Sequence, residues 1–218
     1  MDIWLQNLTG GEGSFLGSLV GSTIGFLALI GGALFNYRLN RLRDARVRFE
    51  DDRSVAAALY GEILLLRREI SQVAKIVSAT YLAEQGLRNP HLKFDRHFLD
   101  RQRLSSPLLY NALAPQIGRL AADLVLGITE FHADFEAVRT WLPQLVEDES
   151  RGFSYSVLVV LTPASNALSR VIPTLRKIER SLGMQAAVLD LDVGEMPTVI
   201  DMENELWAEV AAAKREDG

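Results

Sequence analysis

The sequence predicts an all-α protein with one N-terminal transmembrane helix and a small cytoplasmic helical bundle. Three observations predict this fold class: an uncharged apolar stretch at 15–35, a cluster of arginines after it, and apolar stripes with helical spacing in the rest of the chain. The composition is that of a globular protein, 48% apolar and 23% charged, without cysteine. The lack of cysteine excludes disulfides, thiolate catalysis and cysteine-ligated metal sites.

The apolar stretch reads FLGSLVGSTIGFLALIGGALF and contains no charged residue. A helix of this length covers about 30 Å, which is the hydrocarbon thickness of a bilayer. Its Leu, Ile, Val and Phe residues favour insertion by about 3–7 kcal/mol before the Gly and Ser positions are subtracted. The expected division of the chain is a short external tail at 1–14, a transmembrane helix at 15–37, a basic juxtamembrane helix at 38–53, and a cytoplasmic helical domain with an acidic C-terminal tail at 54–218.

Charges on the two sides of the stretch predict its orientation. Asp2 and Glu12 precede it without any Lys or Arg. Five arginines follow it: Arg38, Arg41, Arg43, Arg46 and Arg48. The positive-inside rule therefore places the N-terminus outside and the C-terminal domain in the cytoplasm. A cleaved signal peptide is the alternative, but it requires a basic n-region and a shorter apolar core. The arginines are interpreted first as a topology signal, with attraction to anionic lipid headgroups as a second role.

Small residues share one face of the predicted span. Gly17, Gly21 and Gly25 are four residues apart, and Ala28 and Gly32 continue the same face. Such a face lets two helix backbones approach closely in lipid. It predicts a homodimer, a higher oligomer or a groove for another span, whereas the alternative is that Gly is simply common in membrane helices.

Two long apolar stripes predict the main helices of the bundle. The first consists of Leu59, Ile63, Leu66, Ile70, Val73 and Val77, and its helix is expected to end near Gly86. Neither Gly nor Pro occurs between Ala33 and Tyr60, so the span can run unbroken into this helix. The second stripe runs over 117–145, with Pro115 expected in its first turn and Pro143 expected to kink or end it.

The remaining elements are less regular. Residues 153–161 read FSYSVLVVL and are compatible with a short strand, but a lone strand has no partner, so helix is favoured. Thr162 and Pro163 resemble an N-cap and a first helical residue, and Pro173 interrupts the stripe that follows. A last helix is expected from Met196 to Ala213, with Val199, Leu206 and Val210 on one face. The prediction is a span plus three or four further helices.

No pattern of catalytic or ligand-binding residues stands out. The net charge is −5, and 188–218 carries nine acids against two bases, which argues against nucleic acid as a partner. No two of His91, His97 and His132 have the spacing of metal ligands, and the acids around His132 are interpreted as a solvated helix face: Glu130, Asp134 and Glu136. We therefore expect no enzyme activity, no cofactor, no metal and no small-molecule substrate.

Residues 104–135, and especially LLYNALAPQIGRLAADLVLGITEFH, resemble a pattern in uncharacterised bacterial single-span membrane proteins. In these proteins an N-terminal anchor and an Arg-rich segment lead into a helix similar to 56–63, and a later helix opens as 117–120 does. The resemblance implies a bacterial inner-membrane location and supplies no activity. Two functional hypotheses follow: a membrane-anchored helical interaction module that self-associates through its span, or an accessory or sensory subunit of a larger membrane complex.

Overall fold

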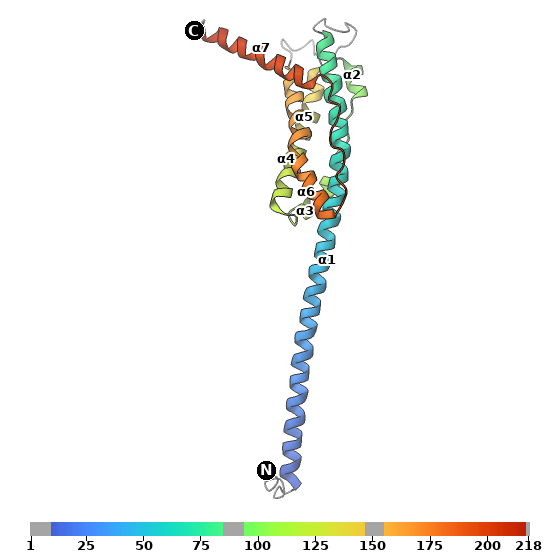
Figure 1. The fold of residues 1–218 in the computed structure, drawn as a ribbon, viewed down its shortest axis with the longest axis vertical. Coiled ribbons are helices and arrows are strands. Elements are labelled where there is room, and N and C mark those ends of the chain that lie inside the picture. Colours follow the sequence, from blue (N-terminus) through green and yellow to red (C-terminus); the bar gives the residue numbers. More distant parts are fainter. Residues whose placement is uncertain (1–9, 85–93, 147–154, 217–218) are drawn as a thin grey trace. The chain divides into compact units, whose positions relative to one another are not determined.

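The computed structural model describes residues 10–84, 94–146 and 155–216, and all regular elements in these ranges are helices (Figure 1). The elements are α1 Gly10–Glu84, α2 Arg96–Arg101, α3 Leu108–Ile117, α4 Ala122–Trp141, the 3₁₀ turn η2 Leu142–Leu145, α5 Leu158–Arg170, α6 Ile172–Leu182 and α7 Met196–Glu216. The predicted all-α class is confirmed for these residues. The described part of the second unit has more helices than the three or four expected beside the span. Two short ones, α2 and α3, lie between α1 and α4, and the break before Pro173 separates α5 from α6.

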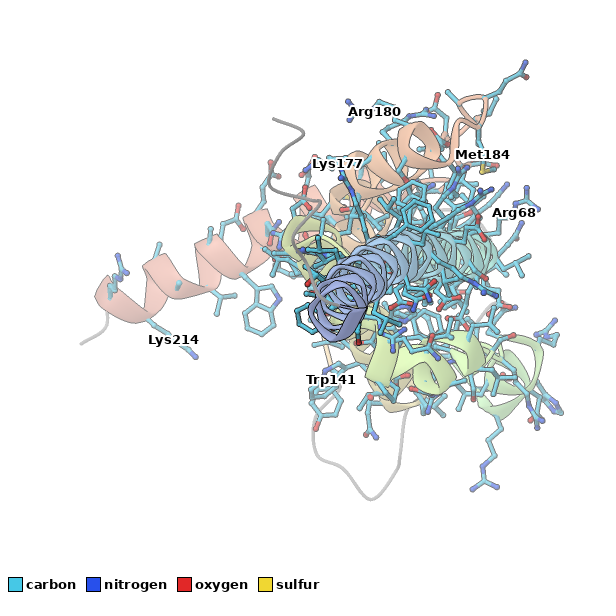
Figure 2. All side chains as sticks on the ribbon, turned by 90° about the horizontal axis from the view of Figure 1, so that it is seen from below. Arg68, Trp141, Lys177, Arg180, Met184 and Lys214 are labelled. Carbon is cyan, nitrogen blue, oxygen red and sulfur yellow. The ribbon has the colours of Figure 1, made fainter. Side chains whose placement is uncertain are left out.

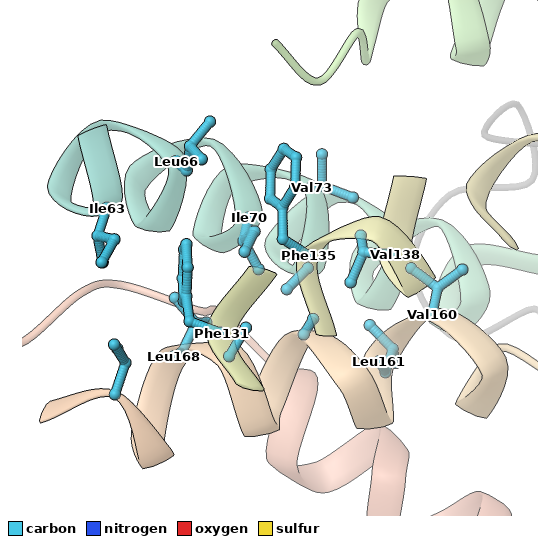
Figure 3. Close-up of a cluster of buried hydrophobic side chains, with 14 of the residues drawn as sticks. Ile63, Leu66, Ile70, Val73, Phe131, Phe135, Val138, Val160, Leu161 and Leu168 are labelled. Carbon is cyan, nitrogen blue, oxygen red and sulfur yellow. The ribbon is translucent and has the colours of Figure 1, made fainter. Parts of the chain in front are cut away.

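The chain divides into two compact units, Met1–Asp51 and Asp52–Gly218, and α1 contributes residues to both. The second unit contains the hydrophobic core. Every residue of the first predicted stripe is buried, and Leu59, Ile63 and Ile70 are completely so. Figure 3 shows this stripe facing aromatic and aliphatic side chains of α4 and α5, among them Phe131 and Leu161. The apolar spacing in the sequence therefore identified the core-facing side of α1 in this unit.

The second predicted helix begins later than expected. Pro115 lies inside α3, which ends at Ile117, and α4 starts only at Ala122. The expectation that Pro115 would open the long helix is therefore wrong. The cause is a contact from far along the chain, because the carboxylate of Glu62 accepts hydrogen bonds from the first free amides of α3. These bonds stabilise a separate helix upstream of the proline.

The segment before Pro163 is helical rather than extended. α5 begins at Leu158, so Pro163 lies within it, and the expected N-cap at Thr162 is wrong. The hydroxyl of Ser156 accepts a hydrogen bond from the Leu158 amide at 3.1 Å, and Val160 and Leu161 are completely buried in the first turns. Their burial outweighs the backbone hydrogen bond that the proline cannot donate. The preference for helix over strand is confirmed from Leu158 onward, while 153–154 lie outside the described residues.

Pro143 and Pro173 act as the sequence predicts. α4 ends at Trp141 and tightens into η2, in which Pro143 occupies an early position. Pro173 lies in the first turn of α6, directly after the break that ends α5. α6 itself ends at Gly183, whose φ of 68° is the left-handed conformation typical of a helix C-cap. α1 ends at Glu84, and the expected stop signal at Gly86 lies outside the described residues.

Within the described residues, one stretch is long and apolar enough to cross a membrane by length and composition, Leu158–Leu182. It comprises α5 and α6, and its side chains Val160, Leu161 and Leu175 are completely buried in the bundle. A core helix of a soluble protein has the same character, so this stretch is weak support for a membrane location. The predicted span at 15–37 contains side chains outside the described part of the structure and stays a prediction.

Candidate functional site

The N-terminal unit carries large apolar side chains that nothing in this unit covers. Each side chain described between Ser18 and Asp51 is exposed. Phe26 and Phe35 are 63% and 65% exposed, and Leu29 is 74% exposed. An apolar helix surface of this extent is typical of a segment that packs against lipid or against other helices.

The predicted association face is open where the structure describes it. A Cβ atom added at Gly21, Gly25 or Gly32 would meet no atom within 4 Å. Packing among the described residues therefore does not require glycine at these positions. The surroundings of Gly17 and Ala28 lie outside the described residues.

The five arginines that follow the predicted span are all exposed. Arg46 donates through Nε to Glu50 at 3.0 Å, an exposed pair one helical turn apart. Among the described interactions, no ion pair involves the other four: Arg38, Arg41, Arg43 and Arg48. Their charge is thus available to solvent or to anionic groups.

The last helix has an exposed face with two parallel rows of side chains. Val199 is completely buried, but the C-terminal half of α7 extends beyond the other helices of its unit (Figure 1). The apolar row consists of Met202, Leu206 and Val210, and the acidic row of Asp201, Glu205 and Glu209, all exposed. Trp207 beside them is 53% exposed, and Lys214 points away from the α7 backbone (Figure 2). The shared face of Val199, Leu206 and Val210 that the sequence predicts is thus buried only at its first residue.

The described part of the bundle contains several groups of buried polar side chains, and the first of them surrounds His132. The imidazole is 3% exposed and stacks on the ring of Tyr110, with centroids 3.8 Å apart. Its Nε2 lies 4.0 Å from a carboxylate oxygen of Glu62, and neither ring nitrogen has a hydrogen-bond partner. Burial lowers the pKa of His132 to about 4, so the ring is neutral at pH 7.

The second group centres on Glu179. Its carboxylate accepts hydrogen bonds from the Tyr60 hydroxyl at 2.7 Å, from Arg176 at 2.8 Å and from the Ala187 amide at 3.0 Å. Burial opposes ionisation of Glu179, but these donors outweigh it and lower the pKa of the carboxyl group. Burial and the bond to Glu179 raise the pKa of Tyr60 to about 12. The group joins α1, α6 and the segment after α6.

The third group is Arg67, which is 3% exposed. It donates to the backbone carbonyls of Leu168 at 2.8 Å and Leu189 at 3.0 Å. Burial lowers the pKa of its guanidinium, and its Nε has no partner. Arg67 therefore fastens α5 and the segment before α7 to α1, which is a structural role.

The described residues contain no group of three His, Asp or Glu side chains arranged to hold a metal ion. Of the acids near His132, Glu130 is exposed, whereas Asp134 is half-buried and burial raises its pKa. The sequence did not reveal that His132 itself is buried, because its stacking partner comes from another helix. The two rows of α7 could have been found, since each repeats at intervals of four residues.

We compared the chain with protein families, curated proteins and solved structures. No family model, no curated protein and no solved structure matches the chain.

Proposed function

We propose that the chain is a membrane-anchored helical interaction module. Its N-terminal span crosses a bacterial inner membrane once, with the N-terminus outside and the helical domain in the cytoplasm. The exposed apolar side chains described between Phe26 and Phe35 support this proposal, because burying such surface contributes about 25 cal/mol per Å². The exposed arginines that follow the span support the orientation.

The module self-associates through the small-residue face of the span. The open space at Gly21, Gly25 and Gly32 supports this step, because no contact inside the chain occupies it. Backbone contact between two spans requires small side chains at the point of closest approach. No substrate, cofactor or nucleic acid is part of the proposal.

Reporter fusions test the topology. Alkaline phosphatase is active only outside the cytoplasm, so a fusion after Gly218 should be inactive and a green fluorescent protein fusion at the same place should fluoresce. The reverse result would overturn the orientation and with it the cytoplasmic domain. A chain recovered in the soluble fraction would overturn the anchor.

A substitution in the glycine face tests self-association. Gly21→Ile should lower the signal of the span in a membrane two-hybrid assay at least several-fold, because a branched side chain separates the backbones. Leu27→Ile is the matched control, since it lies about 120° from Gly21 around the helix and keeps the apolar character. Equal signals from wild type and Gly21→Ile would remove the homo-oligomer.

An accessory or sensory subunit of a larger membrane complex is the second candidate function. The exposed face of α7 favours it, because apolar and acidic rows side by side complement a helix with apolar and basic side chains. Purification from native membranes in mild detergent separates the two candidates. A single species containing only this chain supports self-association, whereas a fixed complex that Leu206→Asp dissociates supports the accessory subunit.

A further inference from the structure

The second unit contains a pocket of about 300 Å³ between α2, the segment that follows it and the end of α4. Its lining includes four apolar residues, Leu99, Leu104, Leu142 and Pro143. The polar residues of the lining are Gln102, Ser106 and two arginines, Arg103 and Arg139. This volume lies at the lower end of the range for ligand pockets, which leaves space for a molecule of about ten non-hydrogen atoms.

The walls of the pocket are fixed by contacts outside it. The carboxylate of Glu69 on α1 accepts hydrogen bonds from the Ser105 amide at 2.8 Å and from its hydroxyl at 2.6 Å. These bonds tie the segment between α2 and α3 to the core helix. Leu142 is 3% exposed and belongs to the hydrophobic core. The pocket is thus held open before any ligand arrives, which lowers the entropic cost of binding.

Both arginines keep donors for a ligand. Arg139 donates to the hydroxyl of Ser106 at 3.4 Å, and its Nε lies 3.3 Å from a carboxylate oxygen of Glu136. Arg103 lies 3.9 Å from Asp100, an exposed and loose pair. A guanidinium has five N–H donors, so these contacts orient the two groups without using them up. The residues that line the pocket include no acid.

We propose that this pocket binds a small carboxylate with an apolar body, supplied either by a free acid or by the C-terminal residue of a protein chain. The carboxylate lies between Arg103 and Arg139, where planar guanidinium groups form paired, charge-assisted hydrogen bonds. The apolar body contacts Leu99, Leu104 and Leu142. This ligand site goes beyond the proposed anchoring function and does not depend on it.

Ligand-observed NMR on the full chain in lipid nanodiscs tests the ligand chemistry, with empty nanodiscs as the background. The probes are phenylacetate, 2-phenylethanol, which lacks the charge, and acetate, which lacks the apolar body. Phenylacetate should bind at least about tenfold more tightly than either of the other two. The 2-phenylethanol probe loses the charge-assisted hydrogen bonds, and acetate loses the burial of apolar surface. Equal binding of phenylacetate and 2-phenylethanol, or of phenylacetate and acetate, would overturn the proposal.

Variants locate the binding. Arg139→Gln and Arg103→Gln should each weaken phenylacetate binding about tenfold or more, whereas Arg119→Gln, an exposed arginine outside the pocket, should leave it unchanged. Arg103 is 84% exposed at its side chain, so its replacement does not endanger folding. Unchanged binding in both pocket variants would overturn the site.

A short peptide that ends in Phe distinguishes the two sources of the carboxylate. Tighter binding of the peptide than of phenylacetate, lost when its C-terminus is amidated, identifies a protein terminus as the ligand. Exclusion of the peptide while phenylacetate binds identifies a free acid. If neither the peptide nor phenylacetate binds, the pocket is not a carboxylate site.

Discussion

The two parts of α1, one in each unit of the chain, both carry many apolar side chains, but only the part in the second unit contributes to a hydrophobic core. In the second unit, Leu59, Ile63 and Ile70 are fully buried, while Arg68 and Lys75 lie off their stripe. In the first unit, Phe26 and Phe35 are more than 60% exposed, and apolar residues occur on all sides of the helix. Apolar content alone therefore does not define a core. A stripe is typical of a helix that packs on one side in water, whereas an apolar surface all round is typical of a helix in lipid.

Polar residues show the same contrast. In the second unit Tyr60, Glu62 and Arg67 are buried and bond to distant parts of the chain. In the first unit the five arginines are exposed, and Arg46 bonds only one turn along the same helix among the described contacts. Buried polar groups of α1 thus join the bundle together, whereas the arginines of the first unit are exposed to solvent. Substitutions in matched pairs can break or sharpen this contrast.

The largest expected effect concerns two phenylalanines. Phe131 is 1% exposed in the bundle and Phe35 is 65% exposed in the first unit. Phe131→Ala should lower the free energy of unfolding of the bundle by about 3–5 kcal/mol, because it removes buried surface and leaves a cavity. Phe35→Ala should leave bundle unfolding unchanged. Chemical denaturation of the full chain in detergent, followed by far-UV circular dichroism and Trp fluorescence, measures both.

Two outcomes would contradict the predictions for Phe131→Ala and Phe35→Ala. An unchanged midpoint for Phe131→Ala would mean that the side chain is not part of a cooperative core. An equal loss for Phe35→Ala would mean that residues of the first unit pack within the bundle, and the distinction between the two parts of α1 would fail.

The next effect concerns His132 and pH. Its pKa is about 4 when folded, against 6.5 for an ordinary histidine, so between these values the unfolded chain binds the extra proton. The free energy of unfolding should therefore be highest above pH 6.5 and should fall as the pH drops toward 4, because protonation of the unfolded chain favours unfolding. The expected loss is about 3 kcal/mol, at 1.36 kcal/mol per pKa unit. Unfolding free energies measured at intervals from pH 7 to pH 4 give this slope.

Substitution separates His132 from the carboxylates that also titrate in this range. His132→Leu should remove most of the slope, because the unfolded chain then has no imidazole at this position to bind the extra proton. His97→Gln is the matched control, since His97 is exposed and its replacement should keep the slope. Equal slopes in wild type and His132→Leu would show that the histidine is not the group that titrates.

The sequence predicted the elements that depend on local spacing. The stripe on α1, the end of α4 before Pro143 and the break at Pro173 all follow from residues within a few turns of one another. The starts of α3 and α5 were missed for a physical reason. Glu62 caps α3 from 47 residues away, and buried packing extends α5 upstream of Pro163, so neither start has a local signal.

The pocket and the buried histidine were beyond sequence reasoning for the same reason. Arg103 and Arg139 line one pocket although they come from different elements, and no spacing rule connects them. His132 has the exposed neighbours Glu130 and Ala133, and the polar residues around it in the sequence are typical of a solvated helix face. The ring of Tyr110 from α3 stacks on the imidazole and Glu62 of α1 lies 4.0 Å from it, so neighbours from other parts of the chain contribute to its burial.

The smallest expected effect compares two glycines within helices. A Cβ at Gly127 on α4 would lie 2.0 Å from the Thr174 hydroxyl on α6, whereas a Cβ at Gly21 would meet nothing within 4 Å. The Cβ and Cγ2 atoms of Thr174 would also lie at 3.1 and 3.3 Å, so rotating the side chain does not remove the conflict. Alanine favours a helix over glycine by about 1 kcal/mol, but overpacking costs about 1–3 kcal/mol.

Gly127→Ala should therefore lower the free energy of bundle unfolding by a net of about 1 kcal/mol, and Gly21→Ala should leave it unchanged. Adding Thr174→Ala should reduce the loss caused by Gly127→Ala, because it removes the hydroxyl at 2.0 Å and the methyl group at 3.3 Å and leaves only the Cβ contact at 3.1 Å. A double-mutant cycle from denaturation curves measures this coupling. Additive changes in the cycle would mean that α4 and α6 do not approach closely at this point. A loss with Gly21→Ala would mean that its face is already occupied by the bundle, which leaves no room there for a second span.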